Sequence, residues 1–353
     1  MKLKILSVVG ARPQFIKAAV VSSAIRKSCT EVLLHTGQHY DHEMSDIFFQ
    51  DLDLPHADYN LGIGSGRHGQ QTGEMLIGLE EVLIKESPDW VLVYGDTNST
   101  LAGALAAAKL HVPLAHVEAG LRSFNRNMPE EINRMVADRI SQLLFCPSDV
   151  SVRNLAQEGI TDGVHAVGDV MYDSMLQFLP RAEARPSPLD RVGVQARQYV
   201  LATVHRAGNT DDLQRLTAIL ACLEVAEMPV VFPVHPRTQA VLDANDLSIP
   251  PSVQMIDPVG YLDMLMLEKD AFAILTDSGG VQKEALWLEV PCVTLRDETE
   301  WVETVDLGWN EVVGIDPDRV RNALKKERPT ESPPPIYGEG KTADKIAKLI
   351  VEG

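Results

Sequence analysis

Cysteine is scarce in this sequence, and its placement excludes two common kinds of stabilisation. The 353 residues include four cysteines, none in a CxxC pair: Cys29, Cys146, Cys222 and Cys292. Cysteines spaced this widely are not typical of a disulfide framework or of a zinc site. We therefore expect free thiols and, because reduced thiols are typical of that compartment, a cytoplasmic protein.

Long apolar stretches are also missing. A membrane-spanning helix needs about 18 or more apolar residues, and no run in the sequence approaches that length. The opening MKLKILSVVG is apolar but short, Arg12 and Lys17 follow closely, and no small-residue cleavage site is present. We predict a first strand here rather than a signal peptide, and a soluble protein without a membrane partner.

Positively charged residues are fewer than negatively charged ones. The chain has 32 lysines and arginines against 50 aspartates and glutamates, which gives a formal net charge of -18 at pH 7. Such a balance repels the phosphates of nucleic acids and of acidic lipids, so neither partner is favoured. An anionic ligand would need cations concentrated locally.

What the sequence does contain is a regular alternation of short apolar runs with segments of helical period. This alternation predicts an α/β fold with parallel sheets, and 353 residues exceed what one hydrophobic core usually serves. The proline-rich and charged segment RAEARPSPLDRVG, residues 181–193, is predicted to be a linker that cannot continue a helix. We expect two doubly wound Rossmann-like domains, at residues 1–178 and 190–338. In the first, the expected strands are residues 3–9, 31–36, 90–95, 112–117 and 142–146.

Three acidic residues follow the ends of consecutive elements in the first domain. Asp96 ends the strand of VLVYGD, Glu118 ends that of PLAHVE, and Glu130 opens a helix after an irregular loop. Ligands of open parallel sheets bind beyond the carboxyl ends of the strands, so these acids are candidates for one site. Alternatively, Asp96 caps the helix that begins near Asn98, and Glu130 only complements a helix dipole. Clustered carboxylates suit chemistry that removes and returns a proton near neutral pH.

The second domain has a turn suited to an anion. Ser278, Gly279 and Gly280 follow the apolar strand AFAIL and open a helix, so free backbone N–H groups and the helix dipole favour a phosphate there. The alternative is a tight glycine turn without a ligand. Glu284, one turn into that helix, is a candidate partner for a ribose diol, or else a surface acid.

Basic residues occupy similar positions in both domains. His205, with Arg206 beside it, and His235 end strands of the second domain. Arg12 lies at the glycine turn of GARPQFIK and Lys17 one turn into the following helix. Each is a candidate contact to an anionic or polar ligand, although buried histidines are often satisfied by backbone groups and Arg12 could be a surface charge.

Two further patterns resemble known sites without fitting them. The run GSGRHG, residues 64–69, matches G-x-G-x-x-G but follows a poor strand, so no dinucleotide site is predicted. His35, His39 and His42 lie around a Gly-Gln loop without helical register, so a metal site is not favoured. Polar ligand contacts from Gln38 and His39 are preferred. Acids in one domain and phosphate-binding turns in the other together predict a nucleotide-linked substrate bound between two domains.

These motifs, taken in order, resemble those of the non-hydrolysing UDP-N-acetylglucosamine 2-epimerases over nearly the whole chain. The matching stretches are GARPQFIK, HTGQHYD, VLVYGDTNST, HVEAGLRSF, MPEEINR, HRAGN, PVHPR, TDSGGVQKEA and LRDETEW. The resemblance implies the B-type glycosyltransferase fold, with two domains facing a central cleft and a C-terminal helix, residues 341–353, that packs back on the N-terminal domain. It also implies a homodimer and a cytoplasmic enzyme of polysaccharide biosynthesis, such as that of O-antigen.

The resemblance further implies a mechanism and its residues. Enzymes of this family remove the proton at C2 and expel UDP from C1 by anti elimination, then add both back with the proton on the opposite face, which requires no nicotinamide and no other cofactor. By resemblance, Asp96, Glu118 and Glu130 transfer or position the protons, and His205 assists near the diphosphate. The residues implied to hold UDP are Arg12, Lys17, Arg206, Ser278, Gly279, Gly280 and Glu284. Contacts to the sugar or to an activating second UDP-sugar are implied for Gln38, His39 and His235.

Some positions depart from the most familiar members. Gln14 stands where glutamate is usual, Trp301-Val302 replaces an Arg-Pro pair, and Gln70 replaces an arginine that helps to hold the activator. The stretches GARPQFIK, HTGQHYD and TEWVE together resemble the branch that acts on UDP-2,3-diacetamido-2,3-dideoxyglucuronate, whose C6 carboxylate would need a cation such as Arg122 or Arg126. We place the N-acetylglucosamine reaction first and the modified sugar second. A UDP-sugar glycosyltransferase and a non-catalytic UDP-sugar sensor remain the rival functions.

Overall fold

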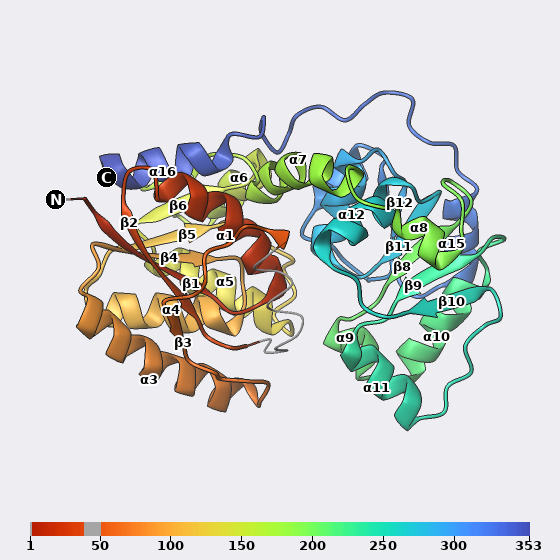
Figure 1. Cartoon of the computed structure of the whole chain (residues 1–353), viewed down its shortest axis with the longest axis horizontal. Helices are drawn as coiled ribbons and strands as arrows, with labels where there is room; N and C mark the ends of the chain where they lie inside the picture. The colour runs from red at the N-terminus through yellow and green to blue at the C-terminus, as the bar shows by residue number, and fades with distance from the viewer. Residues whose placement is uncertain (1, 39–50) are drawn as a thin grey trace. The chain divides into compact units, whose positions relative to one another are not determined.

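The chain folds into two compact units, each built on one parallel β-sheet. The structure is a computed structural model that describes residues 2–38 and 51–353. The first unit comprises Met1–Gln177 with Pro335–Gly353, and the second comprises Phe178–Pro334 (Figure 1). Both alternate strands with helices, so the predicted α/β class with two doubly wound sheets is confirmed.

The sheet of the first unit has the strand order of a doubly wound fold. Its order is β3-β2-β1-β4-β5-β6-β7, and every neighbouring pair is parallel. The chain therefore winds outward in one direction from β1 and in the other from β4, and this switch point is where open sheets of this kind bind ligands. The strands are β1 (Lys4–Val9), β2 (Thr30–His35), β3 (Tyr59–Asn60), β4 (Trp90–Tyr94), β5 (Leu114–Val117), β6 (Leu143–Cys146) and β7 (Val164–Ala166).

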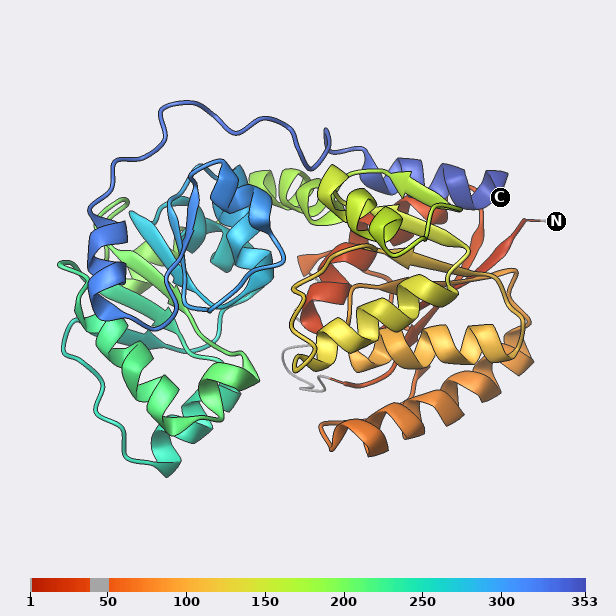
Figure 2. The ribbon, with the colours of Figure 1, turned by 180° about the vertical axis from the view of Figure 1, so that it is seen from behind.

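Helices cover both faces of this sheet, which explains why its central strands are almost continuously apolar. α3 and α4 lie on one face, while α1 and α16 lie side by side on the other (Figures 1 and 2). Strands covered on both sides have no solvent face that would require alternating polar residues. The helices are α1 (Arg12–Ile25), α3 (His68–Glu86), α4 (Asn98–Lys109), α5 (Pro129–Ile140), α6 (Asp149–Gln157), α7 (Val170–Glu183) and α16 (Thr342–Glu352), with α7 running into the second unit.

The second unit repeats the design with a six-stranded sheet. Its order is β10-β9-β8-β11-β12-β13, again parallel throughout, with the switch point between β8 and β11. The strands are β8 (Val200–Thr203), β9 (Val230–Pro233), β10 (Val253–Ile256), β11 (Ala273–Thr276), β12 (Cys292–Thr294) and β13 (Asn310–Val312). The helices are α8 (Pro188–Val192), α9 (Ala207–Thr210), α10 (Leu213–Glu224), α11 (Pro236–Ala244), α12 (Tyr261–Lys269), α13 (Gly279–Trp287), α14 (Val302–Asp306) and α15 (Pro317–Leu324).

The predicted linker at residues 181–193 is wrong in one respect, because much of it is helical. Helix α7 continues through Pro180 to Glu183, and Pro188–Val192 form α8. Proline fits the first turn of a helix, and the Ser187 side chain accepts a hydrogen bond from the Leu189 N–H, which caps α8.

The C-terminal helix α16 belongs to the first unit and packs along α1. Ile346 and Ile350 are fully buried on its inner face. At its first turn the Ala343 N–H donates to the Asp173 carboxylate at 2.8 Å, and Lys27 pairs with Asp344 at 3.0 Å. The helix is therefore attached by both apolar packing and polar contacts.

All four cysteines are free and buried. Burial raises the pKa of Cys146, Cys222 and Cys292 to about 12, so these thiols stay protonated and unreactive at neutral pH. Among the residues that the structure describes, there is no helix with the length and apolar character needed to cross a membrane.

Candidate functional site

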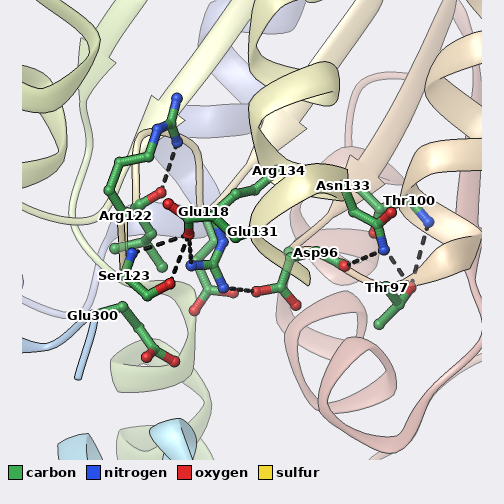
Figure 3. A network of polar contacts seen from close by, with 12 residues as sticks. Asp96, Thr97, Thr100, Glu118, Arg122, Ser123, Glu131, Asn133, Arg134 and Glu300 are labelled. Carbon is green, nitrogen blue, oxygen red and sulfur yellow. Dashed lines mark hydrogen bonds and ion pairs between the residues drawn. The ribbon is translucent and has the colours of Figure 1, made fainter. Parts of the chain in front are cut away.

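Two of the predicted acids leave neighbouring strands at the switch-point edge of the first sheet. Tyr94 of β4 pairs in register with Val117 of β5, and the chain then continues to Asp96 and Glu118 respectively. The Asp96 side chain is 30% exposed and that of Glu118 is 9% exposed, whereas the strands below them are buried. The sheet itself therefore brings these two carboxylates to one place (Figure 3).

A buried arginine connects Asp96 to the helix that follows β5. The guanidinium of Arg134, on α5, forms ion pairs with the Asp96 carboxylate and with Glu131, the latter at 2.8 Å (Figure 3). Asn133 on the same helix donates to the Asp96 carbonyl at 2.9 Å. Asp96 is thus fixed through its side chain and its backbone. The helix cap is Thr97, which accepts from the Thr100 N–H at 3.3 Å, so the capping alternative for Asp96 is wrong.

Glu118 is held by a lysine and by an unusual backbone. Its carboxylate forms an ion pair with Lys17 of α1, and both side chains are less than a tenth exposed. Its φ of 72° lies in the left-handed region, which non-glycine residues rarely adopt and which recurs at functional sites. A Cβ at Gly95 would lie 3.2 Å from Glu118 Oε2 and 3.4 Å from Lys17 Nζ, so the glycine lets this ion pair lie against the β4 turn.

The loop between β5 and α5 is organised by Glu131, not by its neighbour Glu130. Glu131 accepts from the Ser123 N–H and hydroxyl, both at 3.0 Å, and from the Phe124 N–H at 2.9 Å. Glu130 lies in the first turn of α5 and is partly exposed. Glu131 is therefore a structural acid, while Glu130 remains accessible.

Gln14 ties the two loops of the switch point together. Its side-chain oxygen accepts from the backbone N–H groups of residues 10 and 11, at 2.8 and 3.0 Å. Its nitrogen donates to the Tyr94 carbonyl at 2.7 Å and lies within 3.1 Å of the Thr97 and Thr100 hydroxyls. The buried amide thus links the turn after β1 to the turn after β4.

Beneath the acids, four charged or polar groups form a chain that runs from the exposed Glu158 into the interior. Arg122 pairs with Glu158 at 2.6 Å and with Asp138 at 2.7 Å, and Asp138 lies 2.8 Å from His116 Nδ1. Burial alone would raise the pKa of Asp138, but the hydrogen bond and charge of His116, together with Arg122, hold it below its usual value. Burial disfavours the charged form of Arg122 as well, yet its two carboxylate partners raise its pKa overall. Arg122, itself buried, is therefore committed to two ion pairs, one buried with Asp138 and one at the surface with Glu158.

At the switch point of the second unit, Asp277 organises the loop after β8. Its fully buried carboxylate accepts from the His205 N–H at 3.1 Å, the Arg206 N–H at 3.0 Å and the Asn209 side chain at 3.1 Å. The ring nitrogen His205 Nδ1 lies 3.4 Å from Asp277, and the ring of His235 lies 5.9 Å from that of His205. Both histidine rings thus meet at the end of this sheet, as predicted from their positions.

The N-terminus of α13 is crowded by a carboxylate. A Cβ at Gly279 would lie 2.8 Å from Glu300 Oε1, so only glycine fits there. Glu300 in turn pairs with Arg206 at 3.1 Å and with Arg296 at 2.9 Å. Ser278 is the N-cap residue, and its own N–H donates to Thr276 Oγ1 at 2.9 Å. Two guanidinium groups and a helix N-terminus therefore converge, which favours anions.

The remaining candidates are spread over both units. Gly280 follows Gly279 in α13, and Glu284 on the same helix is 4% exposed, so the surface alternative for this acid is wrong. Arg12 is the first residue of α1 and is partly exposed. Gln38 accepts from the Ser99 hydroxyl at 2.7 Å. His39 lies outside the described residues.

Several residues of these networks were missed by sequence reasoning. Glu131 and Arg134 are spaced i, i+3 in MPEEINR, which could have predicted their ion pair. No local pattern joins Arg134 to Asp96, which is 38 residues away in sequence, or Glu300 to Arg206, which is 94 away. Such contacts depend on strand order.

Comparison with known proteins identifies the family. The model of the UDP-N-acetylglucosamine 2-epimerase family matches residues 23–351. A UDP-2,3-diacetamido-2,3-dideoxy-D-glucuronate 2-epimerase of Pseudomonas aeruginosa is 50% identical, covering 99% of this chain and 100% of that protein. A Methanococcus maripaludis UDP-N-acetylglucosamine 2-epimerase homolog is 52% identical over 99% of both chains. The Methanocaldococcus jannaschii UDP-GlcNAc 2-epimerase, solved with UDP-GlcNAc and UDP, is 45% identical with a TM-score of 0.92 and full coverage of both chains. The chain therefore belongs to the UDP-N-acetylglucosamine 2-epimerase family.

Proposed function

We propose that this protein catalyses the reversible C2 epimerisation of UDP-N-acetylglucosamine to UDP-N-acetylmannosamine. The observation that carries the proposal is the pair of carboxylates at the first switch point. Asp96 and Glu118 follow adjacent strands. Asp96 pairs with Arg134 and Glu118 pairs with Lys17, and both of these cations are nearly buried. Membership of the epimerase family supports the same reaction.

The reaction is redox-neutral and needs groups that move one proton. A base takes the proton from C2, the C1–C2 double bond forms, and the C1–O bond breaks with its electron pair leaving on UDP. The resulting 2-acetamidoglucal then adds UDP back at C1 and a proton at C2 on the opposite face. Positioned carboxylates serve both proton steps, and fixed cations stabilise the departing diphosphate.

The first unit supplies the proton-transferring acids in this proposal. Asp96, Glu118 and the accessible Glu130 transfer the protons or position the groups that do so. Lys17 holds Glu118 and adds positive charge. Because Asp96 is fixed through both its side chain and its carbonyl, its carboxylate keeps one orientation while the sugar reacts.

The second unit binds UDP in this proposal. The N-terminus of α13 at Ser278, Gly279 and Gly280 and the neighbouring Arg206 face the diphosphate, and Glu284 binds the ribose diol. His205, whose backbone is fixed by Asp277, assists as the diphosphate leaves. Arg12 contributes a further cation, while Gln38, His39 and His235 contact the sugar or a second UDP-sugar.

UDP-2,3-diacetamido-2,3-dideoxyglucuronate is the second candidate substrate. The Pseudomonas aeruginosa epimerase of that sugar is 50% identical to this chain. A C6 carboxylate needs a cation, and Arg122 is already bound to Asp138 and Glu158. Arg126 is exposed in the loop before α5 and is therefore the candidate for this contact.

Incubation with each UDP-sugar in deuterium oxide, followed by NMR, tests the reaction and the substrate. We expect deuterium at C2 together with the inverted configuration for the true substrate. Asp96→Asn and Glu118→Gln should each lower turnover by about 10²- to 10⁴-fold, because each removes a proton-transferring group. Both variants should still bind UDP in calorimetry. Absence of C2 exchange with both sugars contradicts the proposal, and UDP-sugar binding without exchange would indicate a sensor.

The homodimer expected from the resemblance remains a prediction. Multi-angle light scattering of the purified protein measures the mass directly and compares it with the 38.8 kDa of one chain.

A further inference from the structure

The chain of charged and polar groups beneath the acids contains a histidine with an acceptor at each ring nitrogen. His116, on β5, is fully buried. Its Nδ1 lies 2.8 Å from Asp138 Oδ1, and its Nε2 lies 2.7 Å from the carbonyl oxygen of Gly95. A neutral imidazole has one N–H and one lone pair, so it can donate to only one of these oxygens.

The Gly95 contact excludes a lone pair at Nε2. A carbonyl oxygen can only accept, and two lone pairs at 2.7 Å would repel each other. Nε2 therefore bears a proton, which leaves the state of Nδ1 to be decided by Asp138.

Asp138 is an ionised acceptor. Its carboxylate also accepts from Arg122 at 2.7 Å and from the Gly120 N–H at 3.1 Å. These donors and the charge of Arg122 favour the ionised form of the carboxyl against the cost of its burial. An ionised carboxylate facing Nδ1 requires a proton on that nitrogen as well.

The charges around His116 alternate in sign, from Glu158 through Arg122 to Asp138. Glu158 lies at the exposed end of this chain, whereas Arg122 and Asp138 are buried, so the charge that faces the ring inside the protein is the Asp138 carboxylate. Further titratable groups lie close by: Arg139 contacts the Glu158 carbonyl at 3.4 Å, Asp96 directly follows Gly95, and the Cys146 thiol of β6 is neutral because its pKa is raised to about 12.

We propose that His116 is a positively charged positioning residue, whose Nε2–H holds the Gly95 carbonyl and thereby fixes the turn that presents Asp96 beside Glu118. Gly95 has a φ of 62°, and its own N–H donates to the Val117 carbonyl at 2.9 Å. The peptide group before Asp96 is thus held by His116, and the Asp96 carbonyl by Asn133. A shift of this turn would move Asp96 relative to the Glu118 carboxylate, which packs against Gly95.

The charge is tested by ¹⁵N NMR of protein labelled at histidine. Comparison of the wild type with His116→Gln assigns the His116 ring, and His111→Asn, at an exposed position, assigns a control ring. Because each ring nitrogen faces an acceptor, we expect a proton on both His116 nitrogens at about pH 7. A bare ring nitrogen in His116 at that pH overturns the proposal.

The positioning role rests on the proposed epimerase function and is tested by turnover. His116→Gln should lower kcat about 10- to 100-fold with the dissociation constant of UDP unchanged, because a small misplacement of a reacting group is costly. Asp138→Asn removes the counter-charge but leaves a neutral ring able to donate from Nε2 to Gly95, so it should lose less activity and show an unprotonated Nδ1. His111→Asn should match the wild type.

The outcomes separate the two proposals. Wild-type kcat in a folded His116→Gln variant overturns the positioning role. If His116→Gln does not fold, the ring whose Nδ1 signal changes in Asp138→Asn is assigned to His116 and the wild-type spectrum decides its charge, while the activity of Asp138→Asn decides whether the charge or the hydrogen bond matters. If the wild type shows no C2 exchange with either sugar, the proposed function fails while the NMR result stands by itself.

Discussion

At the residue scale, one buried amide shows how a single side chain can set the geometry of the switch point. Gln14 is 1% exposed, and both its oxygen and its nitrogen are occupied. A carboxylate has the same shape but cannot donate to the Tyr94 carbonyl. The departure from the glutamate that is usual at this position therefore changes hydrogen bonding and not packing.

We predict that Gln14→Glu destabilises the protein by about 1–3 kcal/mol at neutral pH, because it leaves a buried carbonyl facing a carboxylate. The loss of stability should be smaller in mild acid, because a protonated glutamate can donate to the Tyr94 carbonyl again. Urea unfolding at several pH values measures both effects, with Gln157→Glu, at an exposed position of α6, as the matched control. A loss that does not depend on pH would contradict this explanation.

A second prediction at the residue scale concerns Asp138 and the pH dependence of the unfolding free energy. Its pKa is lowered in the folded protein, so its ionisation stabilises the fold above the unfolded pKa of about 3.9 and this stability is lost as pH falls through the lower folded value. Asp138→Asn should cost on the order of 3–5 kcal/mol near neutral pH, because it breaks a buried network of charges. The difference from the wild type should narrow below about pH 4 in urea unfolding. Asp162→Asn, at an exposed position, should show no such trend.

At the element scale, helix α16 shows how a segment distant in sequence completes the first unit. Ile350 is fully buried against this unit, while the next residue, Val351, is 47% exposed. The helix begins where Ala343 donates to Asp173, 170 residues earlier in the chain. Its stability therefore depends on packing rather than on local propensity.

We predict that Ile350→Ala lowers the unfolding free energy by about 2–5 kcal/mol, whereas Val351→Ala changes it by less than about 0.5 kcal/mol. The first removes packed methyl groups from the core, and the second trims a side chain in solvent. Chemical denaturation of both variants makes the comparison. Equal losses of unfolding free energy in the two variants would show that Ile350 is not buried against the first unit.

The elements also show where sequence patterns were informative. The apolar runs predicted the ends of β1, β2, β4, β5 and β6 to within two residues. The short strands β3 and β7, at the edges of the sheet, have too few apolar residues to stand out. Helix α8 was missed because its prolines suggest a linker, although proline at a helix start is compatible with the missing N–H.

At the scale of the whole molecule, each unit has a hydrophobic core of its own. One core is built on β1, β2, β4 and α4, and others cover both faces of the second sheet. Chains with separate cores often unfold in more than one step.

We predict two unfolding transitions in differential scanning calorimetry. UDP should raise the midpoint temperature of the transition that belongs to the second unit. A ligand at 100 times its dissociation constant stabilises its binding unit by about 2.7 kcal/mol. Ile350→Ala identifies the transition of the first unit because it should lower the midpoint temperature of that transition. If UDP raised only the midpoint temperature of the first unit, the assignment of UDP binding to the second unit would be wrong.

The sequence by itself determined the alternation of strands and helices, the strand ends that bear Asp96, Glu118 and Ser278, and the family. These features depend on local apolar patterning and on motifs that are contiguous in the chain. Only the tertiary structure decided that Arg134 pairs with Asp96, that Lys17 pairs with Glu118, and that His116 lies between Asp138 and Gly95. Those contacts follow from the order β1-β4-β5, and pairing between distant segments leaves no local periodicity to read.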